Sequence, residues 1–342
     1  MESFFINKVL LLPYYLILKL RHYLYDTGFF KSYKFDIPII IVGNISAGGT
    51  GKTPHTEYIV SHFLEKGPVA VLSRGYGRKS RGFRYVNIDD TALMSGDEPL
   101  QIKHKFPNAI VAVDANRVRA IKTLMALPAQ QRPSVIVMDD AFQHRRVIPS
   151  TSIILVDYSR PMSRDNLLPV GSLRDLPEQI ARANIIIVTK CPPQMSQEDQ
   201  FNWENSLKLS PTQKLFFSAM KYSEAKAVFP EGDKRYIYSN FAQLVTAIAN
   251  PKPLEYELMS NYKIIKKLRY RDHKNFSKRD AASINNLAEK SPKAVIFTTE
   301  KDAKRLVLLT SLTDNVKLRI FYLPIEVTIL NESGSCFFNV LK

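Results

Sequence analysis

Short apolar runs alternate with longer stretches of helical spacing over the first 190 residues. Runs that are apolar on both faces are typical of parallel strands covered by helices on each side. They span residues 38–42, 69–72, 109–113, 135–138, 153–156 and 185–188. The pattern therefore predicts an α/β fold with a mostly parallel sheet flanked by helices. Ligands of such folds bind at the carboxyl ends of the strands.

The alternation ends near residue 191, where a polar stretch begins with Pro192 and Pro193. A proline pair followed by polar residues is typical of a linker or a surface excursion. We therefore expect a main domain over residues 29–191 and a second domain over residues 192–342.

The second region has its own strand and helix signals. Residues 294–299 and 318–323 read as strands, and Ser277 and Asp280 have the spacing of a capping box. That box predicts a helix running to about residue 290. The second domain is thus expected to be a smaller α/β unit.

The amino terminus carries one more apolar run, at residues 9–18, with Phe4 and Phe5 before it and Lys19 after it. A spanning helix needs about 20 apolar residues, so this run is too short. Aromatic and basic flanks favour a helix that lies in a membrane interface, and we assign residues 1–28 to it. The alternative is a helix packed on the protein's own core.

The net charge of the chain indicates which classes of molecule it binds. The chain has 48 Lys and Arg against 32 Asp and Glu, a formal net charge of +16, which favours partners that carry phosphate. No basic block with interleaved aromatics occurs, so we expect no nucleic acid partner. Only Cys191 and Cys336 are present. A disulfide framework or a cysteine zinc site is therefore disfavoured, and a reducing cytosol is the expected compartment.

A glycine-rich segment follows the first strand and carries the clearest chemical signal. It ends in Gly51, Lys52 and Thr53, which is typical of a phosphate-binding loop that leads into a helix. The usual sequence pattern of such a loop has glycine at position 46, where this chain has Ser46. We expect nucleotide phosphates to be held by Ser46, Ala47, Gly48, Gly49, Thr50, Gly51, Lys52 and Thr53.

Two carboxylates, Asp139 and Asp140, end the apolar run at residues 135–138. A carboxylate at a strand end beside a phosphate loop can hold Mg²⁺ or its waters, so we assign both residues and Thr53 to a magnesium site. The alternative is a pair of capping or surface aspartates. Thr189 and Lys190 resemble part of a guanine-reading element, but its aspartate is missing, which disfavours a GTPase.

Several motifs in one order resemble the tetraacyldisaccharide 4′-kinase family, enzymes that phosphorylate the lipid A disaccharide. They lie at residues 42–54, 72–78, 96–99, 139–144, 168–174, 270–273 and 299–302. The chain departs from the family at Ala141, where glycine is usual, and at Lys274, which follows His273 where histidine or a polar residue is common. Neither change removes a group that the chemistry needs.

The resemblance implies a P-loop NTPase-type fold and an ATP- and Mg²⁺-dependent lipid kinase on the cytoplasmic face of the inner membrane, bound peripherally to its anionic surface. The acceptor would be the 4′-hydroxyl of an acylated glucosamine disaccharide 1-phosphate and the product lipid IVA. The resemblance also implies that Asp97, paired with His273, acts on that hydroxyl while Lys52 neutralises phosphate charge. Without it, Asp97 reads as a turn residue and His273 as a surface residue.

Substrate contacts are assigned to Arg74 and Arg117, because a guanidinium binds a phosphate with two hydrogen bonds. Solvated loop charge is the alternative for either arginine. Gln143 and His144, which follow the metal carboxylates in their motif, are also assigned to the substrate. No obligate protein partner is expected. A P-loop regulator or chaperone that hydrolyses nucleotide to drive a protein partner would share the phosphate-site residues and is the competing hypothesis.

Overall fold

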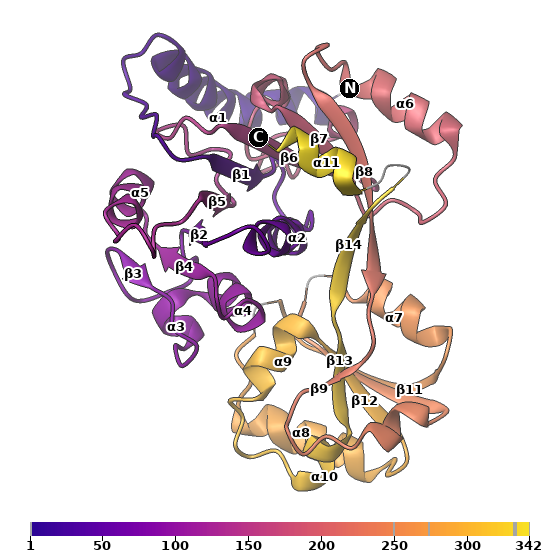
Figure 1. The fold of residues 1–342 in the computed structure, drawn as a ribbon. Coiled ribbons are helices and arrows are strands. Elements are labelled where there is room, and N and C mark those ends of the chain that lie inside the picture. The colour runs from indigo at the N-terminus through magenta and orange to yellow at the C-terminus, as the bar shows by residue number, and fades with distance from the viewer. Residues whose placement is uncertain (1, 249, 273, 331–333, 342) are drawn as a thin grey trace. The chain divides into compact units, whose positions relative to one another are not determined.

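The strand that precedes the phosphate loop, β1, lies at the centre of the larger of the two sheets that the described residues form. The computed structural model describes residues 2–248, 250–272, 274–330 and 334–341 (Figure 1). Across the described part, the larger sheet runs in the order β14 (Ile325–Ile329), β8 (Lys214–Tyr222), β7 (Ile185–Thr189), β6 (Thr151–Asp157), β1 (Ile39–Gly43), β5 (Val135–Asp139), β2 (Val69–Ser73), β4 (Ile110–Val113) and β3 (Arg84–Tyr85). From β8 to β4 every pair is parallel, and β3 is antiparallel to β4. The predicted mostly parallel sheet is confirmed.

Helices cover both faces of this sheet, because alternate strand residues are apolar toward each side. One face packs against α1 (Glu2–Asp26), α5 (Arg117–Met125) and α6 (Gln197–Leu207). The other packs against α2 (Lys52–Leu64), α4 (Asp97–Lys105) and α11 (Gly334–Val340). The connections contain α3 (Ala92–Ser95) and the 3-10 helices η1 (Met162–Arg164) and η2 (Pro177–Arg182).

The chain divides differently from the sequence-based expectation. One compact unit contains residues 1–220 and 327–342, and the other contains residues 221–326. Pro192 and Pro193 lie in the loop between β7 and α6, and β8 then pairs in parallel with β7. The polar stretch is therefore a surface excursion inside the first unit, and the expected boundary after residue 191 falls too early.

The second unit has a five-stranded sheet in the order β11 (Lys263–Arg269), β10 (Phe241–Thr246), β12 (Val295–Thr299), β13 (Ile320–Leu323) and β9 (Lys226–Ala227). Its helices are η3 (Lys234–Tyr238), α7 (Lys252–Met259), α8 (Lys278–Glu289), α9 (Glu300–Leu306) and α10 (Asp314–Arg319). The capping box of Ser277 and Asp280 is formed, so the predicted helix is confirmed. The run at 318–323 starts in α10 and is a strand only from Ile320.

Helix α1 is apolar on two sides. Leu18 is buried in the core, with Tyr14 and Tyr15 packed against it. The other side exposes Leu12, Leu16, Ile17, Leu20 and Tyr23, each more than half exposed. None of the described helices, α1 included, is long and apolar enough to cross a membrane. The helix thus packs on the protein's own core and also presents an apolar surface.

Candidate active site

The glycine-rich loop leads from β1 into α2 through two residues with left-handed backbone. Gly48 has φ +98° and Gly51 has φ +86°, conformations that favour glycine. A side chain at Gly51 would also lie 2.4 Å from the Met220 methyl carbon. Gly49 is not in this region and has open space around it. Two of the three glycines are therefore required by the turn itself.

Donors outside the loop hold its carbonyl groups. Arg160 donates to the Ala47 carbonyl (3.4 Å), Lys190 to that of Gly49 and Thr189 to that of Thr50 (2.9 Å). In a trans peptide the C=O and N–H point in opposite directions. Capture of these carbonyls therefore turns the N–H groups of Gly48 and Gly51 toward the opposite side, whereas the Thr50 N–H donates to the Gly48 carbonyl oxygen (3.0 Å). That is the orientation which an anion-binding loop requires.

His55, in the first turns of α2, holds the last carbonyl of the loop. Burial lowers the pKa of His55 to about 4, so the ring is neutral at physiological pH. Its Nδ1 lies 2.7 Å from the Gly51 carbonyl oxygen and its Nε2 2.9 Å from Ser218 Oγ. Because a carbonyl only accepts, Nδ1 carries the proton and Nε2 accepts from the serine hydroxyl. The imidazole thus ties the loop to β8.

The two predicted metal carboxylates lie at the carboxyl end of β5, which neighbours β1. Asp139 is buried and accepts a hydrogen bond from Thr56 Oγ1 (3.1 Å), whereas its Oδ2 is buried without a partner in the described part of the chain. Burial raises the pKa of Asp139, and the nearby Glu98 and Asp140 raise it further. A cation would satisfy this oxygen and offset the cost of ionising it. The residues therefore fit Mg²⁺.

Asp140 has the opposite electrostatic environment. Partial burial alone would raise its pKa, but hydrogen bonds from Arg174 and the charge of Lys52 lower it. Lys52 Nζ lies 3.8 Å from Asp140, and the Arg174 guanidinium contacts both carboxylate oxygens. Within the described residues no group of three His, Cys, Asp or Glu side chains surrounds a metal position. Mg²⁺ needs no such cage, because substrate phosphates and water usually complete its coordination.

Asp97 is the first residue of α4 and follows Gly96, whose φ is +90°. The next residue, Glu98, acts on the pKa of Asp139, so the start of α4 lies near the metal carboxylates. His273 lies outside the described residues. Its predicted pairing with Asp97 stays a prediction.

Three of the residues assigned to substrate come together. Burial, and after it the neighbouring charge of Arg74, lower the pKa of Arg117 to about 10, although the nearby carboxylates of Asp139, Asp114 and Asp140 act to raise it. Burial, together with the charges of Arg117, Arg146, Arg21 and Arg74, lowers the pKa of His144 to about 4. A neutral imidazole among guanidinium groups is an environment suited to an anion.

Gln143 is placed differently from these three residues. Its side-chain amide donates to the Asn44 backbone carbonyl oxygen (2.8 Å), and the backbone carbonyl oxygen of Gln143 accepts from the Arg21 side chain. The structure thus connects Gln143 to the entrance of the phosphate loop and to α1.

The family is decided by comparison with known proteins. A family model described as Tetraacyldisaccharide-1-P 4′-kinase matches residues 5–341. The chain belongs to this family. It is 42% identical over 324 residues to the tetraacyldisaccharide 4′-kinase of Phocaeicola vulgatus, covering 93% of this chain and 88% of that protein. It is 40% identical over 333 residues to that of Flavobacterium johnsoniae, covering 96% and 94%.

A solved structure shares the fold. The crystal structure of LpxK from Aquifex aeolicus in complex with ATP matches with a TM-score of 0.72 at 24% sequence identity, covering 98% of this chain and 99% of that one. Membership of the tetraacyldisaccharide 4′-kinase family confirms the resemblance that the motifs indicated.

Arg174 and Lys190 are among the residues that contact the site directly and lacked a predicted role. Arg174 ends the family motif at 168–174, and Lys190 belongs to the pair that resembles a guanine reader. Lys190 donates to Asp157 (2.6 Å) as well as to the phosphate loop. The motif positions were visible in the sequence, but their partners lie far away along the chain.

Proposed function

We propose that this chain transfers the γ-phosphoryl group of ATP to the 4′-hydroxyl of a tetraacylated glucosamine disaccharide 1-phosphate, forming lipid IVA in lipid A biosynthesis. The observation that carries the proposal is the grouping of Lys52, Asp139 and Asp140 beside a loop whose carbonyls are held from outside. This grouping provides a cation and a metal position at one strand edge, next to the amide dipoles of the loop, as phosphoryl transfer requires.

The chain's own residues would bind and orient the nucleotide. Amides of residues 46–53 would surround the β and γ phosphates, and the N-terminus of α2 would add its positive dipole. Lys52 would neutralise phosphate oxygens, while Thr53, Asp139 and Asp140 would hold Mg²⁺. The bound ion would draw charge from the phosphates.

The acceptor hydroxyl must be aligned and must lose its proton. Asp97 would accept that proton, and His273 would orient the carboxylate. The arrangement near Glu98 and Asp139 supports a position of Asp97 beside the phosphates. Arg74, Arg117 and His144 would bind a phosphate of the substrate, and Gln143 would border that site.

A water-insoluble acceptor requires the enzyme at a lipid surface. The exposed apolar side of α1 and the net charge of +16 support peripheral attachment to the anionic cytoplasmic face of the inner membrane. Phe29 and Phe30, which follow α1, are exposed as well and would extend this contact.

The test is a transfer assay with labelled ATP, Mg²⁺ and the purified lipid disaccharide in detergent. We expect the label in the lipid, with its loss in Lys52→Ala and in Asp97→Asn, and retained Mg-ATP binding in Asp97→Asn. Rapid ATP hydrolysis without lipid, stimulated by a protein, would instead favour a regulator or chaperone. Undiminished transfer by Asp97→Asn would remove the base assignment.

A further inference from the structure

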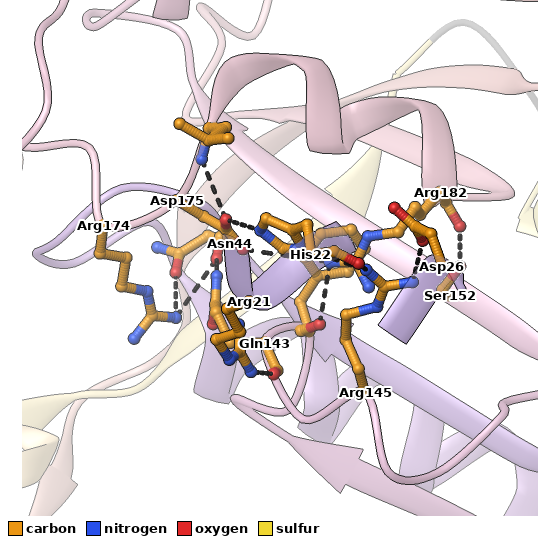
Figure 2. Close-up of polar contacts among 12 residues, drawn as sticks. Arg21, His22, Asp26, Asn44, Gln143, Arg145, Ser152, Arg174, Asp175 and Arg182 are labelled. Carbon is orange, nitrogen blue, oxygen red and sulfur yellow. Dashed lines mark hydrogen bonds and ion pairs between the residues drawn. The ribbon is translucent and has the colours of Figure 1, made fainter. Parts of the chain in front are cut away.

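Polar side chains on the inner side of α1 reach two loops of the nucleotide site. Figure 2 shows His22 beside Asp175 and Arg21 beside Gln143. In addition, the Tyr14 hydroxyl donates to the Arg174 carbonyl oxygen (2.9 Å). A helix that serves only as an anchor has no need of these contacts.

The strongest contact is the buried pair of His22 and Asp175, whose side chains are 4% and 0% exposed. His22 Nε2 lies 2.6 Å from Asp175 Oδ1, while its Nδ1 lies 3.1 Å from Arg145 Nη1. A guanidinium only donates, so Nδ1 accepts and Nε2 carries the proton that is donated to Asp175. Both ring nitrogens are therefore used, and the ring has one orientation.

Asp175 is joined to the phosphate loop through its own backbone and that of its neighbour. The amides of Arg174 and Asp175 both donate to the Ile45 carbonyl, and Ser46 forms a β-bridge with Leu173. The position of residues 173–175 thus depends on α1 on one side and on the entrance of the loop on the other.

From this segment the Arg174 side chain reaches the metal carboxylates. Its guanidinium contacts both carboxylate oxygens of Asp140. It also donates to Asn44 Oδ1 (2.5 Å), a contact that Figure 2 shows. The Asn44 side chain in turn donates to Thr50 Oγ1 (2.7 Å) in the phosphate loop. A chain of direct contacts therefore runs from α1 to both parts of the predicted Mg-nucleotide site.

We propose that Tyr14, His22 and Asp175 are positioning residues for the magnesium site, acting through Arg174 on Asp140. The proposal rests on the proposed function in one respect, the placement of Mg²⁺ at Asp139 and Asp140. If this is so, helix α1 is part of the nucleotide site and does not serve only to attach the protein to a membrane. Substitution of a residue that orients a metal ligand changes the metal affinity, although the residue itself does not touch the ion.

The test measures how Mg²⁺ concentration affects binding of a fluorescent ATP analogue in detergent, with no acceptor present. His22→Leu removes the donor to Asp175, and His22→Gln retains one. Tyr14→Phe removes a single hydroxyl and keeps the ring, so it tests the same connection where His22→Leu fails to fold. Tyr15→Phe is the matched control on the same helix.

We expect the half-saturating Mg²⁺ concentration to rise about tenfold in His22→Leu and severalfold in Tyr14→Phe. It should return toward the wild-type value in His22→Gln and stay unchanged in Tyr15→Phe. A second arm combines Tyr14→Phe with Asp140→Asn. If Tyr14 acts through Asp140, the hydroxyl has no further effect once the carboxylate is gone.

An unshifted Mg²⁺ midpoint in Tyr14→Phe, or an undiminished effect of that change in the Asp140→Asn background, would overturn the proposal. Loss of folded protein in His22→Leu with an unchanged midpoint in the remainder would show a packing role and overturn it too. Because the assay contains no lipid, failure to phosphorylate the disaccharide with these shifts intact would refute only the proposed function.

Discussion

Glu57 of α2 accepts a 2.6 Å hydrogen bond from Lys105 of α4, which ties the helix after the phosphate loop to the helix that begins with Asp97. The Glu57 side chain is only 3% exposed, and Gln101 donates to its other oxygen (2.9 Å). The two helices thus share a buried carboxylate.

We expect Lys105→Met to lower the free energy of unfolding by about 2 kcal/mol, because a buried acceptor loses a charged donor. Urea unfolding in the absence of nucleotide measures this. Lys66→Met, at an exposed lysine just after α2, is the control and should change stability by less than about 0.5 kcal/mol. Equal effects of the two changes would refute a stabilising role of the Glu57 contact.

A second prediction concerns pH and the neutral imidazole of His55. Its pKa is lowered to about 4 in the folded protein, from an ordinary value of 6.5. Between these values the unfolded chain binds the additional proton, so stability falls as pH falls from about 6.5 to about 4. The slope from this residue approaches about 1.4 kcal/mol per pH unit.

Urea unfolding at several pH values compares wild type with His55→Gln, whose amide can donate to Gly51 and accept from Ser218. We expect the variant to lose less stability than wild type over this window, since glutamine does not titrate. Parallel pH profiles for the two proteins would show that His55 is not held neutral in the fold.

The strands of the first sheet were predictable because their runs are apolar on both faces. β11 was missed because lysine and arginine occupy most of its seven positions, and none of these is buried. β8 was missed because it follows a polar excursion that reads as a domain linker. Local pattern shows which segments can be strands, but pairing of β8 with β7 is a tertiary fact.

The same division holds for the site. That Lys52, Asp139 and Asp140 lie together was predictable, because each lies in or directly after a recognisable strand and turn. The contacts of Arg174 were not, since its partner Asn44 lies 130 residues earlier in the chain. Helix α1 shows a further limit, because an apolar sequence does not say which side faces the core.

The exposed side of α1 supports a third prediction. The triple change Leu16→Ser, Ile17→Ser and Leu20→Ser removes apolar surface that the protein's own core does not cover. We expect release from anionic vesicles in sedimentation, with Mg-ATP affinity unchanged. Leu18→Ala, on the buried side, should lower stability by about 2–5 kcal/mol and leave sedimentation unchanged.

Comparison of the triple variant with Leu18→Ala distinguishes a role of α1 in membrane attachment from its role in packing on the core. If the triple variant sediments with vesicles like wild type, the exposed side of α1 is not the lipid contact. Deletion of the whole helix cannot make this distinction, because it would also leave the Asp175 carboxylate buried without His22.

Lys190 gives the last prediction, because it contacts the phosphate loop and a buried carboxylate together. Its Nζ donates to the Gly49 carbonyl and to Asp157, whose side chain is 4% exposed. We expect Lys190→Met to raise the Kd for Mg-ATP about tenfold, which corresponds to about 1.4 kcal/mol, the scale of one hydrogen bond to a charged group. Lys208 is the matched control: like Lys190 it has left-handed backbone, with φ of 47° against 59°. Lys208→Met carries the same backbone strain and should leave the Kd unchanged, so equal Kd values for the two variants would show that the loop does not depend on Lys190.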